Sequence, residues 1–190
     1  MDTLSELLFV VSNSLLFPVV IMLLCMFIFT IVYLGGVTGE ALQRLKWKKP
    51  LNILIRELKA EPDKKIRPAD IPDTEGLPGI AFNNLTADKD KLIDDLQLES
   101  EHLLNKLMLG IRLGPILGLA GTLIPLGPAL TALSTGDIAT LSSRLVVAFT
   151  TTVLGLLIGG ACFAMHSMRR SWYMQDINDI EFIMKRVEMK

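Results

Sequence analysis

Three stretches without Asp, Glu, Lys or Arg constrain this 190-residue chain more than any other feature. They cover residues 7–39, 113–136 and 145–168, and each exceeds the ~20 helical residues that cross about 30 Å of hydrocarbon. The chain is also more apolar than a typical soluble domain, with 51% hydrophobic residues before glycine is counted. We therefore expect an all-α integral membrane protein with three transmembrane helices.

The first stretch is interpreted as a retained membrane helix and not as a cleaved signal peptide. Its start, MDTLSE, carries no basic residue, and its apolar part is longer than that of a signal peptide.

The basic residues predict the topology. Eighteen of the nineteen Lys and Arg residues lie in 40–112 or 169–190, and Arg144 is the exception. By the positive-inside rule, these two segments are expected in the cytoplasm and the N-terminus outside. The predicted parts are an N-terminal region with helix one (1–39), a cytoplasmic helical loop (40–112), helix two (113–136), a short external turn (137–144), helix three (145–168) and a cytoplasmic C-terminal helix (169–190).

The cytoplasmic segments have helical patterns of their own. Helix one is expected to continue past residue 39 until Pro50 interrupts it. A short amphipathic piece over 51–60 should follow, and after it a proline-rich loop. A new helix should begin near Thr86, with an apolar stripe at Leu92, Leu96, Leu103 and Leu107, and run into the membrane. The tail has heptad spacing at Tyr173, Ile177, Ile180, Met184 and Val187, which fits packing on the chain's own helices or a contact between copies.

The second and third stretches each place small residues on one helical face. On helix two these are Gly114, Gly118, Thr122, Pro125 and Ala129, and on helix three Ala148, Thr152, Gly155 and Gly159. Pro125 also frees the carbonyl of Gly121 beside Thr122. Such faces allow close helix approach, and polar groups inside a membrane protein are functional candidates.

Each threonine can also have a purely structural role, because its hydroxyl can donate a hydrogen bond to a backbone carbonyl of its own helix. We prefer this structural role for Thr150 and Thr151, whereas Thr122 and Thr152 lie on the glycine faces at similar depth. None of the three stretches contains an Asp, Glu, Lys or Arg, so a proton carrier would have to come from another chain.

The region from about 112 to 168 resembles the MotA/TolQ/ExbB proton channel family. An LGLxGT-like motif falls on residues 117–122, and a second pattern falls on Ile138, Ala139, Thr140, Ala148, Thr152, Gly155 and Leu156. Three helices with an external N-terminus resemble the TolQ/ExbB branch. Val147 stands where that branch usually carries a glutamate, and Arg144 where it carries a small residue.

The resemblance implies a pentameric ring in the cytoplasmic (inner) membrane that encloses a dimer of single-span partners of the ExbD, TolR or MotB type. Each partner helix would bear one essential Asp. Ion flow would drive movement of the ring against the partner, with the proton as the expected ion and sodium as the second choice. Thr122 and Thr152 would face that Asp, while Gly118, Gly121, Pro125, Ala148 and Gly155 would line the pore. No catalytic residue, cofactor, metal or nucleic acid is expected. The alternatives are an oligomeric small-solute transporter and a non-conducting membrane scaffold.

Overall fold

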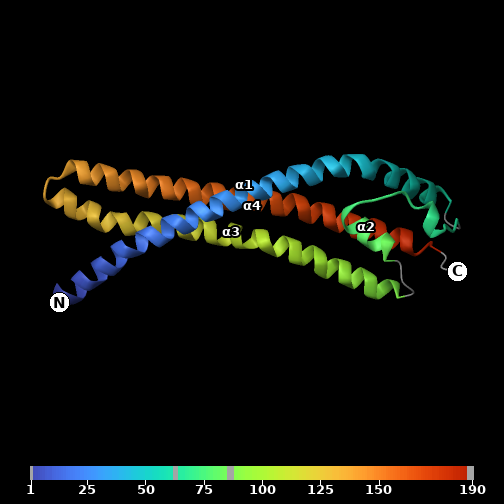
Figure 1. The fold of residues 1–190 in the computed structure, drawn as a ribbon, viewed down its shortest axis with the longest axis horizontal. Coiled ribbons are helices and arrows are strands. Elements are labelled where there is room, and N and C mark those ends of the chain that lie inside the picture. Colours follow the sequence, from blue (N-terminus) through green and yellow to red (C-terminus); the bar gives the residue numbers. More distant parts are fainter. Residues whose placement is uncertain (1, 62–63, 85–87, 188–190) are drawn as a thin grey trace. The chain divides into compact units, whose positions relative to one another are not determined.

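A computed structural model describes residues 2–61, 64–84 and 88–187 (Figure 1). The elements are α1 (Asp2–Ala60), the 3-10 helix η1 (Pro68–Asp70), α2 (Gly76–Asn83), α3 (Lys89–Ser134) and α4 (Ile138–Met184). Among the described residues the only strand-like pairing is an isolated bridge between Ile66 and Val187. The all-α prediction is confirmed, and α1, α3 and α4 are each long and apolar enough to cross a membrane.

The chain divides into two compact units, which are described separately. The span unit contains residues 1–34 and 107–165, and the polar unit contains residues 35–106 and 166–190. The three long helices each contribute to both units.

Helix α1 is not interrupted at Pro50, which corrects the sequence-based expectation. It continues from Asp2 to Ala60 although proline lacks the N–H of a helical hydrogen bond. The Pro50 ring is exposed, while Trp47, Leu51, Ile55 and Leu58 are buried together on the neighbouring face. Burial of that face on both sides of the proline offsets the cost of the missing bond.

Capping interactions set the ends of α3. The Asp88 carboxylate accepts a bond from the Lys91 backbone N–H at 3.0 Å, so α3 begins at Lys89, and Thr86 lies outside the described residues. At the other end Gly136 adopts φ +74°, and the N–H of Asp137 bonds the carbonyl of Ala132. This is the Schellman arrangement, which favours glycine at that position. Residues 135–137 connect the two helices, since α4 begins at Ile138.

Two apolar clusters hold the polar unit together. One joins α1 to the end of the chain through Leu51, Ile55, Leu58, Ile183 and Val187. The other joins α2, α3 and α4, with the following buried members: Leu77, Ala81, Leu96, Leu104, Tyr173, Ile180 and Met184. The heptad-spaced tail therefore packs on the chain's own helices.

The C-terminal segment predicted as a helix over 169–190 is the end of α4. Helix α4 ends at Met184, where the Lys89 ammonium donates to the carbonyls of Met184 and Val187 at 2.6 and 3.0 Å. A cation at this position satisfies carbonyls that a helix end leaves without partners. Residues 188–190 of the predicted helix lie outside the described residues.

Candidate ion pathway along α3 and α4

In the span unit α3 and α4 run side by side through a glycine seam, which we define as Gly114, Gly118 and Gly121 of α3 with Gly155 and Gly159 of α4. A Cβ added to Gly155 would lie 2.5 Å from the carbonyl oxygen of Gly114 and 2.8 Å from Cα of Gly118. A Cβ on Gly118 would lie 3.1 Å from the carbonyl oxygen of Thr151. Because these neighbours are backbone atoms, the two helices touch main chain to main chain, as the small faces predicted.

Thr151 is the threonine that the seam buries. Its side chain packs directly on Gly121: a Cβ added to Gly121 would lie 2.6 Å from both Cβ and Oγ1 of Thr151. The Thr151 hydroxyl donates to the carbonyls of Val147 and Ala148 of its own helix at 3.1 and 2.9 Å. This is the backbone-bonded, packing role that the sequence favoured for Thr151.

Thr122 and Thr152 lie beside the seam and are both half-buried. The Thr122 hydroxyl donates to the Leu119 carbonyl at 2.7 Å, and the Thr152 hydroxyl donates to the Ala148 carbonyl at 3.3 Å. Cα of Thr152 is 3.5 Å from a Cβ built on Gly118, so Thr152 lies one helical turn from the level of Thr122. Each hydroxyl oxygen keeps lone pairs that can accept a further hydrogen bond.

The five other residues that were predicted to line the pore share one property. Gly118, Gly121, Pro125, Ala148 and Gly155 are all buried in this single copy. Gly118, Gly121 and Gly155 belong to the glycine seam, and the half-buried Thr122 and Thr152 lie at its border. Val147, at the position where a glutamate was expected, is half-buried as well.

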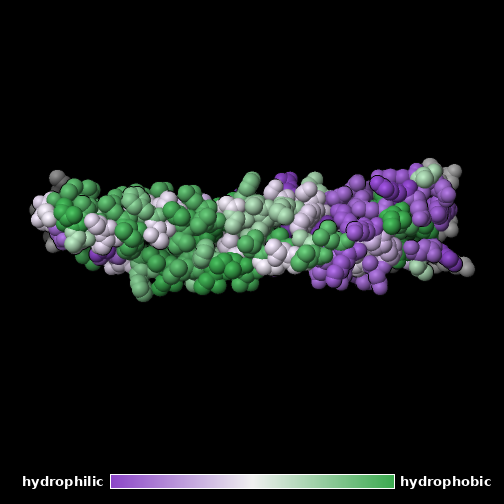
Figure 2. Space-filling view, turned by 90° about the horizontal axis from the view of Figure 1, so that it is seen from above, coloured by the Kyte–Doolittle hydropathy of each residue, from purple (hydrophilic) through white to green (hydrophobic). Residues whose placement is uncertain are grey.

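Much of the remaining surface of the span unit is apolar (Figure 2). Large side chains on all three of its helices are exposed, for example Phe17 at 75%, Val32 at 67%, Leu130 at 64% and Phe149 at 66%. An apolar surface of this extent in a single copy needs lipid or other protein to cover it.

The described residues hold no cluster of three or more His, Cys, Asp or Glu side chains that could bind a metal ion. Cys162 is buried, its Sγ is 3.7 Å from the hydroxyl of Thr30, and a Cβ on Gly110 would overlap it. Cys162 therefore packs α4 against both α1 and α3.

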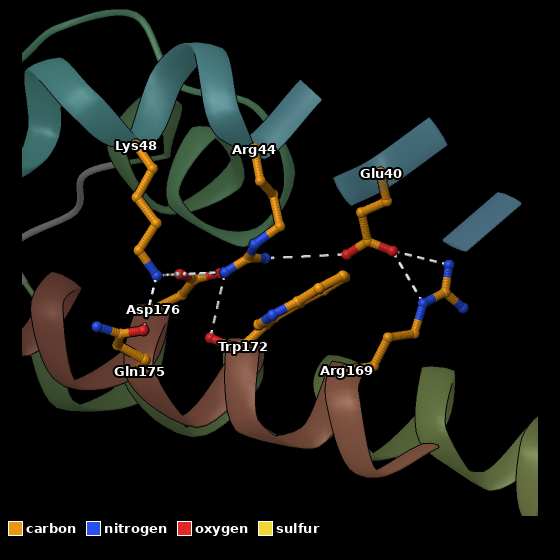
Figure 3. A network of polar contacts seen from close by, with 7 residues as sticks. All are labelled: Glu40, Arg44, Lys48, Arg169, Trp172, Gln175 and Asp176. Atoms are coloured by element: carbon orange, nitrogen blue, oxygen red, sulfur yellow. Dashed lines mark hydrogen bonds and ion pairs between the residues drawn. The ribbon is translucent and has the colours of Figure 1, made fainter. Parts of the chain in front are cut away.

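A buried charge cluster in the polar unit escaped the sequence analysis (Figure 3). Arg44 of α1 places Nη2 2.6 Å from both carboxylate oxygens of Asp176 of α4, and Nζ of Lys48 is 3.7 Å from Oδ1. One turn earlier on α1 and two turns earlier on α4, the Arg169 guanidinium donates to the Glu40 carboxylate at 2.9 and 2.7 Å. These contacts fasten α1 to α4 through charge-assisted hydrogen bonds.

Aromatic rings and burial complete this cluster. The guanidinium carbon of Arg44 is 5.3 Å from the Trp47 ring centroid and 5.0 Å from that of Trp172. Burial raises the pKa of Asp176, against the opposing effect of Arg44. Burial, followed by the nearby Glu40 carboxylate, raises the pKa of Tyr173 to about 12.

The heptad spacing of the C-terminal segment already contained a sequence signal for this buried charge cluster. Asp176 comes three residues after Tyr173 and four before Ile180, so it has the spacing of a core position. A carboxylate at such a position requires a buried cationic partner. The sequence alone did not indicate which of the basic residues of α1 would supply it.

Comparison with known proteins identifies a family for the part of the chain that contains α3 and α4. The model of the MotA/TolQ/ExbB proton channel family matches residues 83–181, which include α3, the turn and nearly all of α4. Neither the curated proteins nor the solved structures yield a match. The match covers more than half of the chain, and the glycine seam lies within it. Together with three helices fit to cross a membrane, it shows that this multi-pass membrane protein belongs to the MotA/TolQ/ExbB proton channel family.

Proposed function

We propose that the chain is the ring-forming stator subunit of a proton-driven membrane motor, and that copies surround single-span partner helices that each carry an essential Asp. The ring would lie in the cytoplasmic membrane with the polar unit inside the cell. This orientation is supported by the distribution of basic residues, of which eighteen of nineteen lie on one side.

One observation carries the proposal: Thr122 and Thr152 border a tightly packed seam between two segments, 113–136 and 145–168, that lack Asp, Glu, Lys and Arg. Hydroxyls accept and donate hydrogen bonds but do not titrate at ordinary pH. A proton that passes along this border therefore needs a carboxylate from another chain. The available driving force is ~2.3 kcal/mol per charge for each 100 mV of membrane potential.

The family membership supports a role as a channel. The glycine seam supports the proposal that α3 and α4 form the wall of that channel. Because α3 and α4 touch through backbone atoms, they behave as one rigid wall, with the threonines at one border. Gly118, Gly121, Pro125, Ala148 and Gly155 would stabilise this wall, and Thr122 and Thr152 would face the partner's Asp.

The test compares two threonines of the same helix. Thr150 is exposed and its hydroxyl bonds to Val146 at 2.8 Å, so Thr150→Val is the matched control for Thr152→Val. Each variant would be purified with whatever single-span protein accompanies it and placed in liposomes that contain a pH-sensitive dye. We expect Thr152→Val to assemble normally but to lose most proton flux, and Thr150→Val to retain it.

Two results would contradict the proposal. Equal flux through both variants would remove Thr152 from the pathway and favour a scaffold. Mass spectrometry of the complex from its native membrane should also identify a single-span protein with an Asp in its span. If no such protein accompanies the chain, the motor is the wrong assignment and a transporter becomes the better one.

A further inference from the structure

The polar unit has two opposite edges of opposite charge. Helix α4 lies between α1 and α3, because one apolar cluster joins it to α1 and the other joins it to α3 (Figure 1). The outer sides of α1 and α3 therefore form the two edges of this three-helix layer. The α1 edge borders α4, which contributes Gln175 and Asp179 to the groove beside it, and Lys59 lies over the Phe182 ring.

The α1 edge is basic with an apolar centre. Lys49, Ile53, Arg56 and Lys59 follow one another at helical spacing and line a groove of about 500 Å³ between α1 and α4. Ile53 is 60% exposed, although it lies among charged residues. We call this surface the basic edge.

The α3 edge is mostly acidic, and the one cation on it among the described residues, Lys91, is paired with Asp95 at 3.1 Å. Asp90, Asp94, Leu98 and Glu101 recur at intervals of four, four and three residues, all exposed, and Leu98 is 64% exposed. A shallow depression formed by Asp94, Gln97, Leu98 and Glu101 marks this surface, which we call the acidic edge. The acidic edge therefore has an exposed leucine, Leu98, among carboxylates, whereas the basic edge has an exposed isoleucine, Ile53, among cations.

The two edges also agree in register. Helix α1 leaves its charge-free stretch after residue 39 and α3 enters its own at residue 113, so the two helices are antiparallel in the polar unit. Ile53 follows the first boundary by 14 residues and Leu98 precedes the second by 15. At 1.5 Å per residue, both lie about 21–23 Å along their helices. On the same count Lys49 lies within about 3 Å of the level of Glu101, and Arg56 within about 3 Å of the level of Asp94.

We infer that the acidic edge of one copy docks on the basic edge of the next, with Leu98 against Ile53. This inference rests on the proposed ring and specifies which surfaces of the polar unit meet in it. Because the two surfaces differ and lie on opposite sides of the layer, the contact is heterologous, and its repetition closes a ring when the rotation permits. Charge complementarity at such a contact fixes register and suppresses wrong pairings.

Disulfide trapping tests the contact directly. In a Cys25→Ala, Cys162→Ala background, Ile53→Cys with Leu98→Cys should form intermolecular disulfides on oxidation and give a ladder of oligomers on denaturing gels. Ile53→Cys alone should give no dimer. The matched control is Ile53→Cys with Glu99→Cys, because Glu99 lies at the same depth but 100° around α3, where it lines the cavity beside α2. We expect little cross-linking in that control.

Charge reversal gives an independent measurement. Lys49→Glu with Arg56→Glu should lower the cross-linking yield about fivefold or more, and so should Asp94→Lys with Glu101→Lys. All four changes together should restore it, because each pair again has opposite charges.

The outcomes separate this inference from the proposed function. An intact ring seen by cryo-electron microscopy, without cross-links between positions 53 and 98, overturns the edge contact and leaves the stator assignment in place. A protein that remains monomeric overturns both. Equal yields from the Leu98→Cys and Glu99→Cys pairs overturn the proposed register.

Discussion

Arg44 of α1 and Asp176 of α4 form a buried ion pair in which one guanidinium nitrogen lies 2.6 Å from both carboxylate oxygens. The Asp176 side chain is 1% exposed and that of Arg44 is 9% exposed. The two residues lie 132 positions apart in sequence, so the pair joins the first helix to the last. Removal of one member would leave the other buried with only a longer ion pair, Asp176 with Lys48 at 3.7 Å or Arg44 with Glu40 at 3.9 Å, and a buried charge that loses its close partner is costly.

We therefore predict that Arg44→Met lowers the free energy of unfolding by roughly 3–5 kcal/mol at neutral pH. The loss should shrink as the pH falls, because burial already raises the pKa of Asp176, and protonation removes the charge that lost its close partner. Denaturant unfolding in detergent, followed by the fluorescence of Trp47 and Trp172 beside Arg44, measures the effect.

Two variants control this experiment. Arg44→Met with Asp176→Leu should recover much of the lost stability, since an apolar pair needs no charge compensation. Lys91→Ala breaks an exposed ion pair with Asp95 and should cause no measurable change. A loss in Arg44→Met that is independent of pH would show that Asp176 is not the group that lost its close partner.

Tyr173 should make the protein sensitive to alkaline pH. Its pKa rises to about 12 in the folded protein, first because of burial and then because of the Glu40 carboxylate. A folded-state pKa above the unfolded value gives stability that is complete below about pH 10 and is lost as the pH rises through about 12. Tyr173→Phe should remove this loss.

The titration itself is accessible by absorbance. The chain has two tyrosines, so Tyr33→Phe leaves Tyr173 as the sole tyrosinate signal. The expected midpoint is about 12, and a midpoint near 10 would mean that Tyr173 is solvated in the folded protein.

Sequence alone predicted the all-α class, the three long apolar helices and the small faces of α3 and α4, because hydropathy and helical period act locally along the chain. It did not predict that α1 passes Pro50, since burial of the face around Leu51 depends on residues far away in sequence, such as Ile183. Nor did it predict which threonine enters the seam. Thr151 and Thr152 differ by 100° around one helix, and only the position of Gly121 on α3 decides between them.

The glycine seam predicts opposite effects for two glycines of α4. A Cβ on Gly155 would lie 2.5 Å from the Gly114 carbonyl oxygen, and this backbone atom has no rotamer with which to move away. Gly155→Ala should therefore separate α3 from α4 and lower stability by roughly 1–3 kcal/mol, as overpacking does.

Gly160 is the matched control, because a Cβ there has no neighbour within 4 Å. Gly160→Ala should stabilise the helix by roughly 0.5–1 kcal/mol, since alanine loses less backbone freedom than glycine. Thermal unfolding in detergent measures both variants. Equal effects of the two substitutions would mean that α3 and α4 do not meet at Gly155.

The turn between α3 and α4 gives the last prediction. The Asp137 carboxylate accepts the backbone N–H of Thr140 at 3.0 Å, and hydrogen bonding from Thr140 lowers the pKa of Asp137 below 3.8. A lowered pKa means that this contribution is present above about pH 4 and is lost as the pH falls through the folded value. Asp137→Ala should lower the melting temperature at neutral pH and remove that acid-dependent loss. Asp137→Asn should keep the melting temperature near the unmodified value, because asparagine also caps helices. If Asp137→Asn and Asp137→Ala are equally destabilised, the carboxylate stabilises the turn through its charge and not through the cap.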